Sequence, residues 1–278
     1  MLATAALVSA LMATLIHAHP RIKKSHIRRQ QQFGYTALWN GWAPGMDDVV
    51  QKDIGNCWWD AASIAVVMLS PWWVENLFYW PNGGPTLAGE DNPASNTVDV
   101  TIFDPYNYTM HNFTATIFNE STTEDNPGGC WWHSALSQGL LELGSVENTY
   151  GVNSDETWFS NSGSAALALA ALTGYPAISN QIANYPDEDA FFYDLLKANT
   201  TPIVLSSNEQ VKTTLPSQIA PTHDYAVMNA TTLPNGTRGV TVKNPWGDFE
   251  GYQLQSLVDN CFYLYHLTEW NELSWPGH

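Results

Sequence analysis

The stretch Gln51-Lys52-Asp53-Ile54-Gly55-Asn56-Cys57-Trp58 leads into a long apolar segment. Residues 57–69 (CWWDAASIAVVML) are apolar nearly all round and rich in helix formers, so they predict a buried central helix. Cys57 would then lie in the first turn, where free backbone N–H groups favour a thiolate. The Gln51 carboxamide, six residues earlier, is a candidate donor to an oxyanion beside the sulfur.

Two further motifs lie far downstream: His223-Asp224-Tyr225-Ala226-Val227, and Asn244-Pro245-Trp246-Gly247. Each of these groups on its own is more often structural than functional. A thiol, an imidazole and a carboxamide in this order, however, are the groups of a nucleophilic cysteine site. The predicted catalytic residues are therefore Cys57, His223 and Asn244. Gln51 is the predicted oxyanion donor, and Trp246 would shield the bond between His223 and Asn244 from water.

Together the three motifs resemble the protease core of the calpain family, whose members carry Q-G-x-x-G-D-C-W, G-H-x-Y-x-V and N-P-W-G. The resemblance covers roughly residues 45–268. It implies an α+β, papain-like fold of two lobes, with the cysteine on a helical lobe and the histidine and asparagine on a β-rich lobe. It also implies an endopeptidase that hydrolyses an extended peptide or protein substrate through an acyl-thioester.

The chain departs from the family pattern around each motif. Lys52 replaces a glycine, Asn56 replaces the aspartate before the nucleophile, and Thr222 replaces the glycine before the histidine. Asp224 directly follows His223, so we expect it to alter the pH profile or to compete for the imidazole N–H.

The resemblance also raises the question of whether this chain binds calcium, as calpain cores do. Asp47 and Asp48 precede Cys57 much as one calcium ligand of the family does. Gln138, however, stands where an acidic residue is expected on the helix of residues 131–143. The sequence therefore predicts no cofactor and leaves calcium undecided.

The amino-acid composition indicates a folded, acidic protein. The 278 residues include 13 Trp, 12 Tyr and 10 Phe, only 13% are charged, and the formal net charge is -17. Abundant aromatic residues and low charge predict a folded chain with a large core. The negative charge opposes binding to nucleic acids or to anionic membranes. We expect a monomer.

The N-terminal region predicts export. Residues 2–16 are almost wholly apolar and a small residue, Ala18, follows, so residues 1–18 resemble a secretory signal peptide. Residues 19–29 are basic and end in Arg28-Arg29, a possible cleavage site. They are either a short propeptide, which would make the chain a zymogen, or a basic arm that is retained. No later apolar run is long enough to span a bilayer. We expect a secreted, extracellular protein.

The sequons and the cysteines are consistent with a secreted protein. Six Asn-X-Ser/Thr sequons predict a glycoprotein with these positions at the surface: Asn107, Asn112, Asn119, Asn199, Asn229 and Asn235. If Cys57 is the nucleophile, Cys130 and Cys261 remain as candidates for one disulfide. The alternative is that all three cysteines are buried thiols.

The pattern of elements divides the chain into a helical lobe, residues 30–175, and a β-rich lobe, residues 176–278. Hydrophobic periodicity and turn residues predict helices at 131–143, 164–172 and 189–198, a hairpin from 98–103 and 113–118, and strands at 202–206, 224–229, 240–243 and 262–266. Residues 176–186 are polar and contain prolines, so we interpret them as the crossing between lobes.

Two other classes of function remain open. The chain could be a catalytically inactive binding or adhesion glycoprotein on the same fold, although it retains Gln51, Cys57, His223 and Asn244. A transglutaminase also combines a thiol with a distant histidine, but its third residue is normally an aspartate rather than an asparagine.

Overall fold

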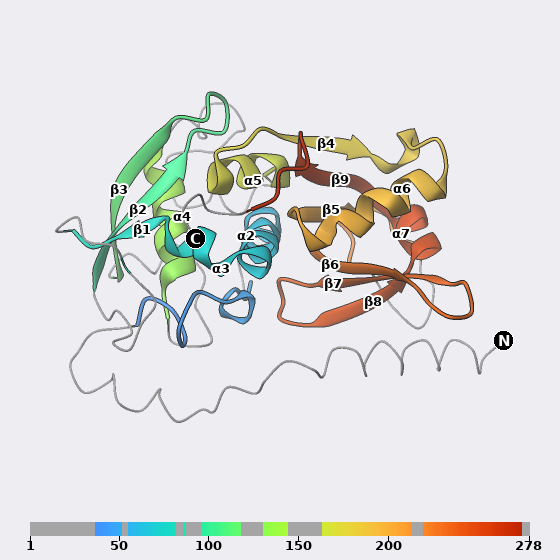
Figure 1. The fold of residues 1–278 in the computed structure, drawn as a ribbon, viewed down its shortest axis with the longest axis horizontal. Coiled ribbons are helices and arrows are strands. Elements are labelled where there is room, and N and C mark those ends of the chain that lie inside the picture. The colour runs from blue at the N-terminus through green and yellow to red at the C-terminus, as the bar shows by residue number, and fades with distance from the viewer. Residues whose placement is uncertain are drawn as a thin grey trace.

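The computed structural model describes residues 37–51, 55–81, 86, 96–117, 130–143, 163–212 and 219–273. These residues form a mixed α/β fold with two separate sheets, in agreement with the α+β prediction (Figure 1). The expected leader and basic segment, residues 1–29, and the sequon at Asn119 lie outside the described residues. No described helix is both long enough and apolar enough to cross a membrane.

The first part of the chain is built around one helix, α2, which has the predicted bounds Cys57–Leu69. A small antiparallel sheet, in the order β1-β2-β3, lies to one side of it with the helix α4 (Figure 1). The other elements of this part are η2 (Met46–Asp48), α3 (Pro71–Glu75), β1 (Phe78–Tyr79), β2 (Thr97–Phe103), β3 (Met110–Thr116), α4 (Trp132–Leu143) and α5 (Ala165–Thr173).

The chain turns sharply between α2 and α3. The Ser70 hydroxyl accepts a hydrogen bond from the backbone N–H of Trp73 at 3.1 Å, and Pro71 occupies the first helical position. A serine N-cap followed by proline favours a new helix start, so the chain changes direction rather than leaving helical structure. The indole N–H of Trp73 then donates to the Leu172 carbonyl of α5 at 3.0 Å.

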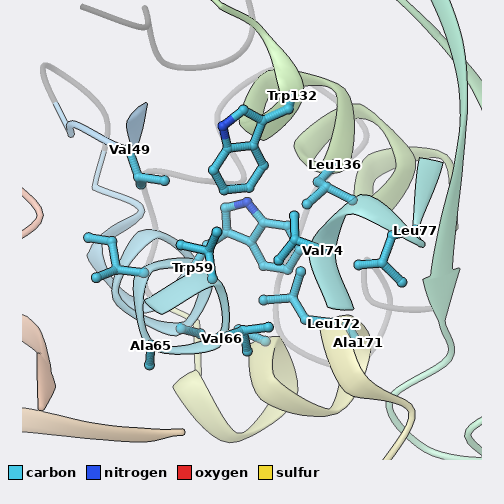
Figure 2. Packing of buried hydrophobic residues seen from close by; sticks show 14 of the residues in the cluster. Val49, Trp59, Ala65, Val66, Val74, Leu77, Trp132, Leu136, Ala171 and Leu172 are labelled. Carbon is cyan, nitrogen blue, oxygen red and sulfur yellow. The ribbon is translucent and has the colours of Figure 1, made fainter. Parts of the chain in front are cut away.

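Tryptophans fill the core around α2. Trp59 is fully buried, and its indole N–H donates to the Ser137 hydroxyl of α4 at 2.9 Å. Figure 2 shows Trp59 between Trp132 on one side and Leu172 of α5 on the other. Trp59 and Trp132 each bury a large apolar area and also donate the indole N–H, to Ser137 and to Asp48, which fixes how these elements pack.

The second part of the chain forms one antiparallel sheet of six strands in the order β4-β9-β5-β6-β7-β8. Its elements are β4 (Ala177–Gln181), η5 (Ile182–Asn184), α6 (Glu188–Leu195), η6 (Leu196–Asn199), β5 (Ile203–Ser207), β6 (Asp224–Thr232), β7 (Arg238–Lys243), β8 (Phe249–Gln253), α7 (Leu254–Asn260) and β9 (Cys261–Leu267). Residues 176–186 are therefore not a simple crossing, because Ala177 begins an edge strand paired with β9.

The two faces of this sheet belong to different cores. Val204 and Ala226 pack into the core of α2, whereas Leu205 and Val227 pack into a second core with residues of α6 and α7. Because side chains alternate along a strand, Asp224 lies on the same face of β6 as Ala226, the face toward α2. This register is what brings Asp224 to the start of that helix.

The structure contradicts the proposed disulfide. Cys130 and Cys261 are both free, buried thiols. Cys130 belongs to the core around α2 and Cys261 to the core on the opposite face of the six-stranded sheet, so the sheet separates them. The alternative of three unpaired cysteines is the one observed.

The sequon asparagines within the described residues have exposed positions. They are Asn107, Asn112, Asn199, Asn229 and Asn235.

Gly139 allows α4 to pack closely against β2, because it has no side chain at the contact. A Cβ on this residue would lie 2.6 Å from Val100 Cγ2 and 2.9 Å from Ile102 Cγ1, both in a strand below the helix. Replacing it with alanine would favour the helix by about 1 kcal/mol but overpack this contact by roughly 1–3 kcal/mol. We therefore expect Gly139→Ala to lower the free energy of unfolding, measured by urea denaturation.

Glu142→Ala, on the exposed side of the same helix, is the matched control and should change stability by no more than about 0.5 kcal/mol. A Gly139→Ala variant as stable as the parent would show that α4 can move away from β2 without cost.

Candidate active site

His223 and Asn244 form a hydrogen-bonded pair at the end of the six-stranded sheet. His223 immediately precedes β6 and Asn244 immediately follows β7, its antiparallel neighbour. Nε2 of the imidazole lies 2.9 Å from Asn244 Oδ1. A carboxamide oxygen can only accept, so Nε2 carries the hydrogen and Nδ1 is left as the basic ring nitrogen. The structure thus brings together two of the predicted catalytic residues.

Glu250 fixes the orientation of the Asn244 amide. Asn244 Nδ2 donates to Glu250 Oε1 at 2.8 Å, so its Oδ1 must face the histidine. The backbone N–H of Trp246 donates to the same Oδ1 at 2.9 Å. Sequence reasoning missed Glu250, because only the return of the chain along β8 brings it beside Asn244.

Trp246 covers the imidazole as predicted. The two rings stack with centroids 4.3 Å apart at 27°, and Trp246 is itself 52% exposed. Burial lowers the pKa of His223, while the hydrogen bond that its ring donates to Asn244 and the charge of Glu250 oppose that shift. The imidazole is therefore neutral near pH 7.

Thr222 holds a strained backbone next to the histidine. Its φ is 51°, in the left-handed region that a β-branched residue rarely adopts. The neighbouring chain holds this geometry, because the His223 N–H donates to the Ser207 hydroxyl and the Ser207 N–H donates to the His223 carbonyl, both at 2.9 Å. The glycine expected at this position would adopt the same φ without strain.

Cys57 is the first residue of α2, as predicted, but its thiol environment differs from the expectation. The hydrogen-bond partner of Sγ is Asp224 Oδ2, 3.9 Å away, and not the imidazole. Burial raises the pKa of the Cys57 thiol to about 12, and the charges of Asp224 and Asp60 add to the effect. Desolvation and the nearby carboxylate thus oppose the thiolate that the helix N-terminus was expected to favour.

Asp224 contacts the thiol and directly follows the histidine in the chain. It is buried, with Cys57 on one side and His223 directly before it in the chain. Burial raises its pKa to about 6, and hydrogen bonds from Ser206 and Cys57 oppose that shift. The predicted effect of Asp224 on the site is thus seen at the sulfur rather than at the imidazole N–H.

Gln51 is buried near the nucleophile and connects the two parts of the site. Its backbone N–H donates to the Pro245 carbonyl at 2.8 Å, which joins the loop before α2 to the turn after Asn244. Its side-chain Nε2 donates to Asn56 Oδ1 at 3.3 Å, a long hydrogen bond that a stronger acceptor could replace. The amide is thus positioned by its own loop.

That hydrogen bond is the first step of a buried polar chain. Asn56 Nδ2 donates to Asp60 Oδ1 at 3.0 Å, and His133 Nε2 approaches the same oxygen at 3.4 Å. Burial lowers the pKa of His133 to about 3, so this histidine is neutral and the contact is not an ion pair. His133 has a structural role here, and the aspartate that the family carries at position 56 would place a second carboxylate beside Asp60.

The calcium candidates have other partners. Asp47, 76% exposed, forms an ion pair with the buried Lys243 of β7 at 2.9 Å. Asp48 accepts from the Trp132 indole and from the Gly45 backbone, both at 2.9 Å. Among the described residues, no group of three or more His, Cys, Asp or Glu side chains could hold a metal ion. In this structure Asp47 and Asp48 therefore make structural contacts, and calcium binding stays undecided.

Gln138, where an acidic ligand was expected, also has a structural contact. Its side-chain amide accepts from the Thr116 N–H and donates to the Thr116 carbonyl, both at 3.0 Å. This pair attaches α4 to the edge of β3.

Comparison of the sequence with models of known protein families and with curated proteins gives no match.

The stack of Trp246 on His223 predicts a measurable shift. Trp246→Ala would expose the imidazole and reduce its desolvation, so we expect the pKa of His223 to rise toward its ordinary value near 6.5. Titration of the imidazole protons by NMR measures this directly. Trp72→Ala, at a half-exposed tryptophan on α3, is the control and should leave the His223 titration unchanged.

Proposed function

We propose that this chain is a cysteine peptidase of calpain type with a papain-like fold. The observation that carries the proposal is the pair of His223 and Asn244, which is oriented by Glu250 and meets the head of α2 at the contact between Cys57 and Asp224. A buried imidazole with a fixed tautomer, next in the chain to a carboxylate that contacts a thiol at a helix start, supports nucleophilic acyl transfer.

In this mechanism the proton of the thiol moves to His223 Nδ1, and the resulting thiolate attacks the scissile carbonyl carbon. The carbonyl electron pair moves to oxygen. When the tetrahedral species collapses, the C–N bond breaks and the leaving amine takes the proton from Nδ1. Water, activated by the same nitrogen, then hydrolyses the acyl-thioester and restores the thiol. Asn244 keeps the imidazolium in place throughout.

The oxyanion donors would be the Gln51 carboxamide and the backbone N–H of Cys57. Gln51 Nε2 now donates a long hydrogen bond to Asn56, so a negatively charged carbonyl oxygen would be the better acceptor. Donors already in place before the reaction contribute most, because they need no reorganisation as charge develops.

One observation favours an alternative. The Cys57 thiol contacts the Asp224 carboxylate and burial raises its pKa, which also suits a catalytically inactive secreted binding or adhesion glycoprotein on the same fold. Transglutaminase activity has less support, because the residue bonded to His223 is an asparagine.

Peptide hydrolysis by the purified chain, assayed from pH 4.5 to 8.5, tests the proposal. We expect Cys57→Ser to abolish cleavage, His223→Ala to lower kcat by roughly 10²–10⁴-fold, and Asn244→Ala to lower it by about tenfold or more, because general acid–base transfer and imidazole orientation are lost. Asn180→Ala, at a partly buried amide on β4, is the control. Equal activity of Cys57→Ser and the parent would refute the proposal.

A second variant tests the oxyanion site. Gln51→Ala should lower kcat by roughly 10²–10³-fold, or about 2.7–4 kcal/mol, with a smaller change in KM, because the donor acts mainly on the transition state. Gln51→Glu keeps the size but adds a negative charge, and should be at least as impaired. If Gln51→Ala raised KM alone, the amide would serve in ground-state binding instead.

A further inference from the structure

The carboxylate of Asp224 is buried directly beside the candidate nucleophile. Its Oδ2 accepts the S–H of Cys57 at 3.9 Å, from the face of β6 that packs on α2. The roles proposed above for Cys57, His223 and Asn244 do not use this group. A buried carboxylate in contact with a reacting atom requires a role of its own.

The surroundings of Asp224 are poor in positive charge. The titratable groups that interact with it are Cys57 on α2 and Cys261 and Tyr265 on β9, and His223 and Tyr225 are beside it in the chain. Asp60 on α2 adds a negative charge that acts on Cys57. Ser206 on β5 contributes a neutral hydroxyl. Lys243 on β7 directs its ammonium to Asp47 and to the Gly247 carbonyl. Within the described chain, no lysine or arginine forms an ion pair with Asp224.

We propose that Asp224 is a further catalytic residue: it accepts the thiol hydrogen bond in the resting site, and the reactive pair of Cys57 thiolate and His223 imidazolium forms only when Asp224 itself carries a proton. This inference rests on the proposed function, and it deepens that function by assigning a proton requirement to the same site.

Counting protons gives the direction of the pH dependence. The resting site holds one proton on the three groups, because Asp224 is charged, Cys57 is a thiol and His223 is neutral. The reactive site holds two, one on Asp224 and one on Nδ1 of His223, which makes the ring an imidazolium. A thiolate beside a charged Asp224 would instead place two buried negative charges 3.9 Å apart.

The reactive form has one more proton than the resting form, so it is favoured as pH falls. Burial raises the pKa of Asp224 to about 6, so the gain comes as pH falls through about 6. A third proton, on the sulfur, removes the thiolate at lower pH. Reactivity should therefore peak in acid and decline as pH rises above about 6.

The proton balance of the chemical step is unchanged. The S–H bond breaks and its proton moves to His223 Nδ1, while the proton on Asp224 comes from solvent and is not consumed. Neutral Asp224 can then donate a hydrogen bond to the sulfur, which stabilises the thiolate that forms before attack.

The test is the alkylation rate of Cys57 by iodoacetamide, followed by mass spectrometry of the Cys57 peptide from pH 4.5 to 8.5. Asp224→Asn has the same size and no charge. At pH 7.5 we expect it to react at least tenfold faster than the parent, and at pH 5 to react within about threefold of it. Asp189→Asn, at an exposed carboxylate paired with Arg238, is the matched control and should follow the parent profile.

Parent and Asp224→Asn profiles that coincide would overturn the inference, and so would slower alkylation of the variant at pH 7.5. Circular dichroism confirms folding, and Asp224→Ala provides a second neutral variant if the asparagine does not fold. Peptide cleavage measured on the same samples separates the two proposals. If Asp224→Asn shifts the pH profile of alkylation but no sample cleaves peptides, only the peptidase proposal is refuted. If cleavage requires Cys57 but the alkylation profile is unchanged, only the role of Asp224 is refuted.

Discussion

The packing of α2 against the six-stranded sheet is the contact on which the rest of the structure depends. The helix is buried on nearly every side, between the tryptophan-rich core and the face of β5 and β6 that carries Val204 and Ala226. Because that contact is apolar and close-packed, it fixes the first residue of the helix relative to the first residue of β6. The meeting of Cys57 with Asp224, and hence the whole candidate site, follows from it.

Much of this arrangement was predictable from periodicity. The predicted bounds of α2 are confirmed, and those of α4, α5, β5 and β6 agree with the prediction within a few residues. The hairpin and the strand at residues 261–267 were predicted for the same reason, since alternation or an apolar run was bounded by turn residues. The missed helices and strands are short, polar or at an edge, so local pattern does not distinguish them from loops; they are α3, β1, β4, β8 and α7.

The site was predictable as a set of residues but not as a set of contacts. His223, Asn244 and Trp246 lie as their motifs indicate, because the pairing of β6 with β7 brings the two motifs to one end of the sheet. The acceptor of the Cys57 thiol depends instead on the register of β6 against a helix 167 positions away in sequence. Glu250 illustrates the same limit: nothing in its neighbourhood marks it, and pairing between β7 and β8 places it. The separation of Cys130 from Cys261 likewise required knowledge of which face of the sheet each one occupies.

The loop of residues 45–51 is bonded to both sides of the boundary between the two cores. The ion pair of Asp47 with Lys243 and the bond from the Gln51 backbone to Pro245 cross that boundary, whereas the Gln51 carboxamide bonds to Asn56 beside Cys57. A small hinge opening between the halves would therefore strain Gln51, whose backbone is bonded on one side and whose side chain is bonded on the other. In mild denaturant the alignment of these groups would be lost while both cores were still intact, so the geometry of the site would be a more sensitive reporter of loosening than helix content.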